Sequence, residues 1–291
     1  MKLIADSGST KTAWAVVENP NNVIKTDGIN PIFMDSVQIE NTLRTQLIPS
    51  LSNPSTGSGT ENLTSNLAES ITEVYFYGAG CANEEKINIV KTAIQSVFGD
   101  IKVEIASDLL GAARGLCGHQ SGIACILGTG SNSCLYENDK ISWNVPALGF
   151  ILGDEGSGAV LGKLLMGNIF KNQLPEAVKQ DFVQTYGYNM MDVIEKVYRT
   201  PLPNRFLASF GPFISKHIAV PEMYNMVYGS LESFIVRNVK QYPTEKYAVN
   251  FTGSIAYYYA DILKDLSVKH NFKIGRISQD PLEGLIQYHK N

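Results

Sequence analysis

The chain opens with short apolar runs separated by small polar turns. Residues 3–5 and 13–17 are apolar, and the stretch between them is rich in Gly, Ser and Thr. This pattern predicts two strands joined by a tight turn, with Asp6 directly after the first apolar run. A further turn is expected at residues 19–22, followed by a third strand at residues 23–26.

The same pattern returns near the middle of the chain. Residues 123–127 are another apolar run, residues 128–132 read Gly-Thr-Gly-Ser-Asn, and residues 133–136 form the expected return strand. Two Gly-rich hairpins about half the chain apart suggest two domains of like fold, each with one phosphate-binding turn. Neither a Walker A loop nor a Gly-x-Gly-x-x-Gly motif occurs, so neither a P-loop nor a Rossmann site is indicated.

The remaining pattern alternates between strand-like and helix-like segments. Strands are expected at residues 74–77, 102–106, 141–145, 246–251 and 272–277, and helices at residues 37–48, 84–98, 109–116, 254–266 and 281–289. Residues 155–242 form a long helical region that Pro201 and Pro203 interrupt. This alternation predicts an α/β protein with parallel strand pairs and a crevice at their carboxyl ends.

Asp6 gives the first turn a specific chemistry. Gly8 allows backbone angles that other residues resist, and small side chains let N–H groups converge on an anion. An aspartate would repel a bare phosphate, but it suits a Mg²⁺ ion that already carries phosphate, usually through water. The turn therefore favours a magnesium–nucleotide complex over a free anion. The alternative is an ordinary hairpin turn with an exposed aspartate.

Composition narrows the range of partners. The net charge is −4 and the pI is near 5.6, which argues against a nucleic-acid partner. No apolar run approaches the roughly 20 residues of a membrane helix, and no signal peptide is evident, so we expect a cytoplasmic protein without a membrane partner. The four cysteines and four histidines lack the spacing of a zinc site, and the cysteines are expected to be reduced and buried.

Four motifs follow one another along nearly the whole chain. They are residues 6–12, residues 128–132, the Gly-Asp-Glu-Gly-Ser stretch at residues 153–157, and Thr-Gly-Ser at residues 252–254. In this order they resemble the motifs of the sugar kinase–heat-shock-70–actin superfamily. Within it, the chain resembles the N-acetylglucosamine kinase and BadF/BadG/BcrA/BcrD ATPase family.

The resemblance implies a fold and a domain division. It implies two ribonuclease-H-like domains, the actin-like ATPase fold, with a ligand cleft between them. We place the first domain at residues 1–117 and the second at residues 118–291. The last helix, about residues 281–291, is expected to pack back on the first domain. A homodimer is compatible with this organisation.

The resemblance also implies site residues. Asp6 would hold Mg²⁺, and Asp108 would be the catalytic base at the end of a strand. Residues 252–254 resemble the adenosine motif of the family. ATP would be bound by residues of the two turns and of this motif: Ser9, Thr10, Thr129, Gly130, Gly253 and Ser254. The sugar would be bound by polar residues of both domains: Asn30, Asp108, Ser131, Asn132 and Asp154.

Each acidic or amide residue also has a structural alternative. Asp108 precedes a helix and would serve as its N-cap. Asp154 and Glu155 form an acidic pair at a predicted helix start, where the helix dipole favours negative charge. Asn30 precedes Pro31, as turn residues often do. The role of Glu155 is left open, and Lys11 is not assigned.

Two functions follow from the resemblance. The first is an ATP-dependent kinase that phosphorylates the 6-hydroxyl of an amino sugar, most directly N-acetylglucosamine. The second is a BadF-type ATPase that activates a partner reductase and holds a [4Fe–4S] cluster with cysteines. Cys125 and Cys134 flank the second turn on paired strands and are expected to be core residues, which favours the kinase.

Overall fold

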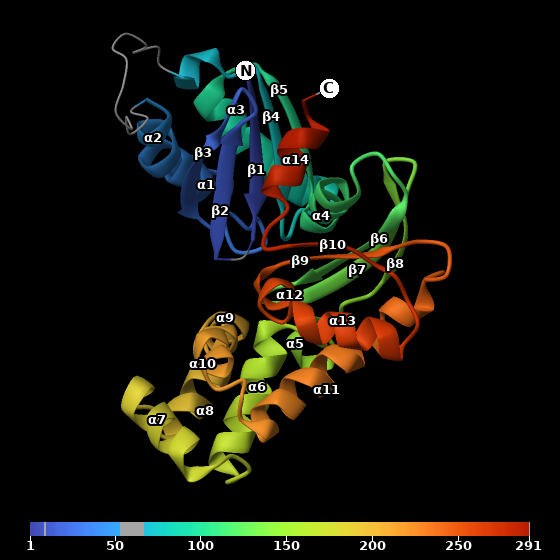
Figure 1. The fold of residues 1–291 in the computed structure, drawn as a ribbon. Coiled ribbons are helices and arrows are strands. Elements are labelled where there is room, and N and C mark those ends of the chain that lie inside the picture. Colours follow the sequence, from blue (N-terminus) through green and yellow to red (C-terminus); the bar gives the residue numbers. More distant parts are fainter. Residues whose placement is uncertain (9, 53–66, 291) are drawn as a thin grey trace, which may run out of the picture. The chain divides into compact units, whose positions relative to one another are not determined.

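A computed structural model describes residues 1–8, 10–52 and 67–290. The described residues form two mixed sheets of five strands each, with helices around them (Figure 1). The chain divides into two compact units, residues 1–120 with 281–291, and residues 121–280. Within the described residues, no helix is both long enough and apolar enough to span a membrane.

The first unit is built on a sheet with strand order β3-β2-β1-β4-β5. Its three antiparallel strands are followed by two parallel ones. The strands are β1 (Lys2–Ser7), β2 (Lys11–Val16), β3 (Asn19–Asp27), β4 (Glu73–Gly78) and β5 (Lys102–Ser107). The helices are α1 (Ser36–Thr42), the π-helix η1 (Leu43–Leu47), α2 (Ile48–Ser52), the 3₁₀ helix η2 (Leu67–Ser70), α3 (Glu84–Phe98), α4 (Asp108–Cys117) and α14 (Leu282–Tyr288).

The second unit repeats this sheet, with order β8-β7-β6-β9-β10 and the same sequence of antiparallel and parallel pairs. The strands are β6 (Gly122–Leu127), β7 (Ser131–Glu137), β8 (Lys140–Val145), β9 (Val249–Thr252) and β10 (Ile274–Ser278). Between β8 and β9 lie α5 (Gly149–Leu152), α6 (Gly158–Phe170), α7 (Glu176–Tyr186), α8 (Met190–Tyr198), α9 (Pro203–Ala208), α10 (Gly211–Lys216), α11 (Pro221–Arg237) and η3 (Val239–Gln241). Helices α12 (Ser254–Tyr258) and α13 (Ala260–Lys269) join β9 to β10. The predicted α/β class with two ribonuclease-H-like units is confirmed.

Three local predictions were wrong. The expected turn at residues 19–22 belongs to β3, because the chain already reverses at Val17–Glu18. Pro20 is tolerated there because β3 is an edge strand. The single helix expected at residues 37–48 is interrupted by the π-helix η1, and the helix expected at residues 254–266 is broken at Tyr259. Periodicity of apolar residues detects a buried face but not a change in helix type.

Alternation along the strands of the first sheet separates two layers of core. Leu3 and Phe76 face a cluster completed by α1, η1 and α3, whereas Ile4 and Tyr77 face the opposite side. That opposite side is covered by α14 through Leu282, Leu285 and Ile286. The second unit has one large cluster that includes residues of its sheet and of α6, α10, α11 and α13.

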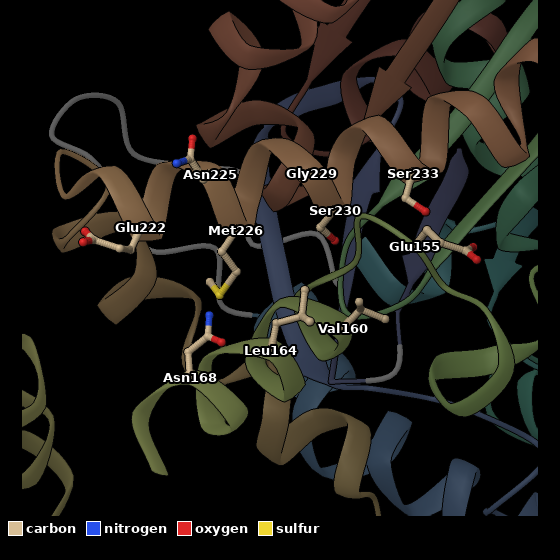
Figure 2. Close-up of a pocket in the computed structure, with 10 residues that line it drawn as sticks. All are labelled: Glu155, Val160, Leu164, Asn168, Glu222, Asn225, Met226, Gly229, Ser230 and Ser233. Carbon is tan, nitrogen blue, oxygen red and sulfur yellow. The ribbon is translucent and has the colours of Figure 1, made fainter. Parts of the chain in front are cut away.

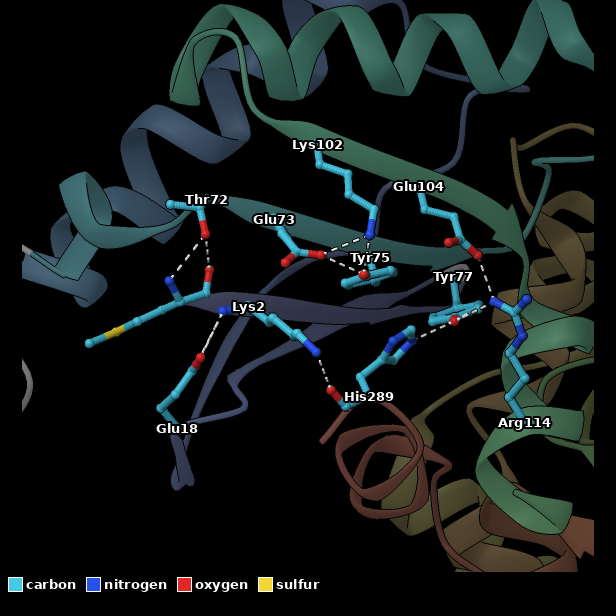
Figure 3. Close-up of polar contacts among 11 residues, drawn as sticks. Lys2, Glu18, Thr72, Glu73, Tyr75, Tyr77, Lys102, Glu104, Arg114 and His289 are labelled. Carbon is cyan, nitrogen blue, oxygen red and sulfur yellow. Dashed lines mark hydrogen bonds and ion pairs between the residues drawn. The ribbon is translucent and has the colours of Figure 1, made fainter. Parts of the chain in front are cut away.

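A polar network also fastens α14 to the sheet (Figure 3). The Nε2 atom of His289 is hydrogen-bonded to Tyr77 Oη at 2.7 Å, and Lys2 Nζ donates to the His289 carbonyl at 2.8 Å. Arg114 Nη1 donates both to Tyr77 Oη at 2.8 Å and to Glu104 Oε1 at 2.7 Å. The chain end is thus held by partners that lie far away in the sequence.

Acidification is expected to destabilise the protein through His289. Burial, reinforced by the charge of Arg114, lowers the pKa of His289 from 6.5 to about 4. Between these two values the unfolded chain binds the proton and the folded chain does not, so stability falls as the pH falls through this window. The loss should reach about 3 kcal/mol. Urea unfolding across this pH range, compared with His289→Phe, measures it, and equal pH slopes in both proteins would contradict a buried neutral histidine.

Candidate active site

Three parallel strands of the first unit end side by side. Ser7 of β1 is in register with Gly78 of β4, which is in register with Ser107 of β5. Asp6 lies one residue before the end of β1, and Asp108 follows β5 directly. The sheet therefore brings the two predicted carboxylates to the same edge, as expected from the carboxyl ends of parallel strands.

Asp108 is the first residue of α4, but it is not the helix cap. The cap is Ser107, whose Oγ accepts a hydrogen bond from Leu110 N at 3.2 Å. The alternative role of N-cap is therefore wrong for Asp108. Its carboxylate accepts a hydrogen bond from Leu109 N at 2.9 Å, which acts to lower its pKa. Burial has the larger effect and raises the pKa of Asp108. A carboxylate that water solvates poorly is a stronger proton acceptor, as a general base needs to be.

Asn30 is buried, with 5% of its surface exposed, and it organises a turn. Its Oδ1 accepts from Ile32 N at 2.9 Å, so the expected turn role is present. Gly80 packs against this carboxamide with a φ of +84°, and a Cβ there would lie 2.3 Å from Asn30 Oδ1. The next residue, Cys81, has its pKa raised to about 12 by burial and by the charge of Asp108. Asn30 thus packs on Gly80, and the residue after Gly80 is close enough to Asp108 to be affected by its charge.

The first predicted phosphate turn joins β1 to β2. Gly8 N donates to Lys11 O at 3.1 Å, which closes the turn. Thr10 is exposed, and its carbonyl accepts from Gly28 N at 3.1 Å. Ser9, the other predicted nucleotide contact of this turn, lies outside the described residues.

The second turn, at residues 128–130, lies against the start of α6. Gly158 N donates to Gly128 O at 2.8 Å, and Ala159 N donates to Thr129 O at 3.0 Å. In a planar trans peptide, the N–H of the next residue points opposite to the carbonyl. The N–H groups of Thr129 and Gly130 therefore point away from α6, both to the same side. Such a pair of backbone donors is suited to an anion.

Asp154 lies beside this second turn. It is 9% exposed, and its carboxylate accepts a hydrogen bond from the backbone N–H of Ser131. A Cβ on Gly130 would lie 3.1 Å from Asp154 Oδ2. Burial raises the pKa of Asp154, although the hydrogen bond from Ser131 acts to lower it. The cap of α6 is Ser157, so the predicted helix-start position of Asp154 is wrong, and its φ of 55° places it in a loop.

The predicted adenosine motif, residues 252–254, packs against the start of the same turn. Gly253 has a φ of +110°, and a Cβ there would lie 2.3 Å from Leu127 O. Only glycine fits this close approach. Ser254 follows as the first residue of α12 and is exposed. The second unit therefore gathers its predicted residues around residues 127–131.

Asn132, a predicted sugar contact, has a carboxamide oxygen that is hydrogen-bonded within the sheet. Its Oδ1 accepts from Asn144 Nδ2 at 3.0 Å and from Ser133 N at 2.9 Å. This oxygen therefore links β7 to β8. Any contact of Asn132 with a sugar would have to use its amide nitrogen.

The sequence analysis did not predict that α11 holds the loop after Asp154. Gly156 N donates to Ser230 Oγ at 3.2 Å, and Arg237 Nε lies 2.9 Å from Glu155 Oε1. Both bonds tie the loop after Asp154 to this helix. Glu155 stands at one end of a groove of about 540 Å³ between α6 and α11 (Figure 2). The one sequence signal was Ser230, a small polar residue inside the predicted helical region.

A solved structure resembles this chain along its whole length. It is a putative N-acetylglucosamine kinase from Porphyromonas gingivalis, 46% identical, with a TM-score of 0.91; the match covers 99% of this chain and 98% of that one. The chain belongs to the family of this putative N-acetylglucosamine kinase. Membership in this family accounts for the duplicated sheet and the two Gly-rich turns.

Two more distant structures resemble this chain in fold. A putative N-acetylglucosamine kinase from Chromobacterium violaceum is 16% identical, with a TM-score of 0.72 and coverage of 99% and 98% of the two chains. A ROK family glucokinase from Streptomyces griseus, in complex with glucose and AMPPNP, is 12% identical, with a TM-score of 0.54 and coverage of 99% and 97%. No model of a protein family and no curated protein matches the chain.

Proposed function

We propose that this protein is an ATP-dependent kinase that transfers a phosphoryl group to the 6-hydroxyl of an amino sugar, N-acetylglucosamine. The observation that carries the proposal is the 46% identity, over 99% of the chain, to a putative N-acetylglucosamine kinase. The partly buried carboxylate of Asp108 at the strand edge supports it, because phosphoryl transfer to an alcohol needs an acceptor for the hydroxyl proton.

In this proposal Asp108 takes the proton of the sugar hydroxyl. Asn30, whose turn borders the same edge, contacts the sugar, as do Ser131, Asn132 and Asp154 of the second unit. Asn30 and Asp154 are both 9% exposed or less, so each is preorganised by its own surroundings. Preorganised hydrogen-bonding groups lose little conformational freedom when a sugar binds.

The nucleotide fits the second turn on chemical grounds. The N–H groups of Thr129 and Gly130 point to the same side and would donate to phosphate oxygens. Thr10 and Ser9 would do the same from the first turn. Gly253 and Ser254 would face the adenosine, because the close packing of Gly253 on Leu127 brings the exposed start of α12 next to the second turn.

Magnesium fits Asp6. Within the described residues no group of three His, Cys, Asp or Glu side chains could hold a metal ion by itself. Mg²⁺ in kinases is typically held by one or two carboxylates together with phosphate oxygens and water. A single partly buried carboxylate at the end of β1, which would contact the ion through bound water, is therefore an adequate contribution from the protein. The bound ion would neutralise charge on the phosphates.

Replacing Asp6 with Ala is expected to raise the Mg²⁺ concentration for half-maximal activity by about 10- to 100-fold, the usual cost of losing an outer-sphere partner. The KM for the sugar should stay nearly unchanged. Titration of MgCl₂ at fixed ATP measures the shift. Asp100→Ala, which removes an exposed carboxylate of the same unit, is the matched control. A raised sugar KM with an unchanged Mg²⁺ requirement would count against the assignment.

Burial of the cysteines argues against the reductase-activating alternative. Cys125 and Cys134 are fully buried, and burial raises the pKa of Cys117 to about 11. Ligands of an iron–sulfur cluster are thiolates, which such burial disfavours. A colourless protein after anaerobic purification is the result expected for the kinase.

A coupled assay of ADP release against a panel of hexoses and N-acetylhexosamines tests the proposed function. N-acetylglucosamine should give the highest kcat/KM, with the product phosphorylated at the 6-hydroxyl by NMR. Glucose and N-acetylmuramic acid serve as the comparison sugars. ATP hydrolysis that no sugar stimulates would contradict the proposal.

A further inference from the structure

Glu155 follows Asp154 directly, and the proposed function gives it no role. Only 17% of its side chain is exposed, although most glutamates lie on the surface. Its Oε1 atom lies 2.9 Å from Nε of Arg237, the last residue of α11, whose side chain is 62% exposed. An ion pair with an exposed partner adds little to stability. It can still fix the position of the backbone beside it, because it joins a loop to a helix.

The residue after Glu155 also rests on α11. Gly156 N donates to Ser230 Oγ at 3.2 Å, and both residues are buried. Figure 2 shows Ser230 and Glu155 toward the same end of the groove between α6 and α11. A Cβ on Gly156, whose φ is +73°, would lie 3.2 Å from Phe234 Cβ and 3.3 Å from Leu127 Cδ2. An ion pair, a hydrogen bond and close packing thus hold this segment on α11.

Asp154 itself has an unfavourable backbone conformation. Its φ of 55° lies in the left-handed region, which a residue with a side chain adopts at a cost. Such a conformation persists where the surroundings hold it. Asp154 N donates to Ala147 O at 3.0 Å, and its carboxylate accepts from Ser131 N. The conformation also depends on where the chain goes next, and α11 fixes that through Glu155 and Gly156.

We propose that Glu155 and Arg237 are positioning residues for Asp154; this inference rests on the proposed function, in which Asp154 contacts the sugar. Without the ion pair, part of the population would leave the left-handed conformation, and only the remaining part would bind the sugar as before. The apparent affinity for the sugar falls by that fraction. In this mechanism neither residue meets the reacting hydroxyl or phosphoryl group, so kcat stays nearly the same.

Arg237→Ala is expected to raise the Kd for N-acetylglucosamine about three- to fivefold by calorimetry, because an exposed ion pair has little free energy to lose. The kcat should change less than about twofold, and Tm less than about 4 °C. Glu155→Gln should raise Kd equally, and the double variant should raise it no further, since both act through one contact. Arg237→Lys, which keeps the charge, should restore part of the affinity. A merely structural role would lower Tm instead.

Lys264→Ala is the matched control, because Lys264 is 63% exposed in an ion pair on α13 of the same unit. It should leave the Kd unchanged. An unchanged Kd in folded Arg237→Ala, or additive effects in the double variant, overturns this inference alone when the wild type phosphorylates the sugar. If Arg237→Ala does not fold, Arg237→Lys and Glu155→Gln decide by the same comparison.

Two further results reach the proposed function itself. Asp154→Asn with an unchanged Kd for the sugar overturns the sugar contact of Asp154, and this inference with it. A wild-type protein that phosphorylates no sugar of the panel overturns the proposed function and the inference together.

Discussion

Asp108→Asn should lower kcat by at least about a hundredfold, the scale of lost general acid–base catalysis. The amide keeps an oxygen that can accept from Leu109 N, so α4 should begin as it does in the wild type. The base must be deprotonated to act. Because burial raises the pKa of Asp108, wild-type activity should fall on the acid side at a higher pH than an ordinary carboxylate would cause. Steady-state kinetics from pH 5 to 8 measure both effects.

A second readout separates loss of the charge from loss of the fold. The charge of Asp108 helps to raise the pKa of Cys81, so this pKa should fall in Asp108→Asn if the segment keeps its place. Asp100→Asn, in an exposed position, is the control and should keep full activity. Near-normal turnover in folded Asp108→Asn would end the assignment of this residue as the base.

Gly284→Ala should destabilise the protein by about 3 kcal/mol or more, at the upper end of the cost of overpacking. A Cβ at this position of α14 would lie 1.8 Å from Gly115 O, an atom of the backbone of α4. A backbone atom within a helix cannot turn aside as a flexible side chain can. The two helices would have to separate, which would weaken the contacts of Leu285 and Ile286 with the sheet. Urea unfolding gives the free energy.

Gly167→Ala in α6 is the matched control, because a Cβ there meets nothing within 4 Å. Alanine has the higher helix propensity, so this variant should be as stable as the wild type or up to about 1 kcal/mol more stable. Hydrogen exchange should also show that α14 loses protection first in Gly284→Ala. Equal stability of the two variants would mean that α14 does not pack as closely on α4 as described.

The sequence determined the architecture through local patterns. Apolar runs followed by small polar turns placed the two hairpins, and helical spacing placed α3 at its observed bounds. These signals are strong because one face of each strand or helix must be buried, which fixes the spacing of its apolar residues. The same turns indicated phosphate chemistry, since Gly and small polar residues are what converging backbone donors require.

The tertiary structure alone decided which polar residues cap helices and which distant side chains form hydrogen bonds. Asp108 and Asp154 each looked like helix-start residues, and only the fold assigned the caps to Ser107 and Ser157. No pattern in the sequence linked Ser230 to Gly156, or His289 to Tyr77. These partners are dozens to hundreds of residues apart, and they meet because packing brings their elements together. Local periodicity carries no information about such encounters, because it records which face is buried and not what buries it.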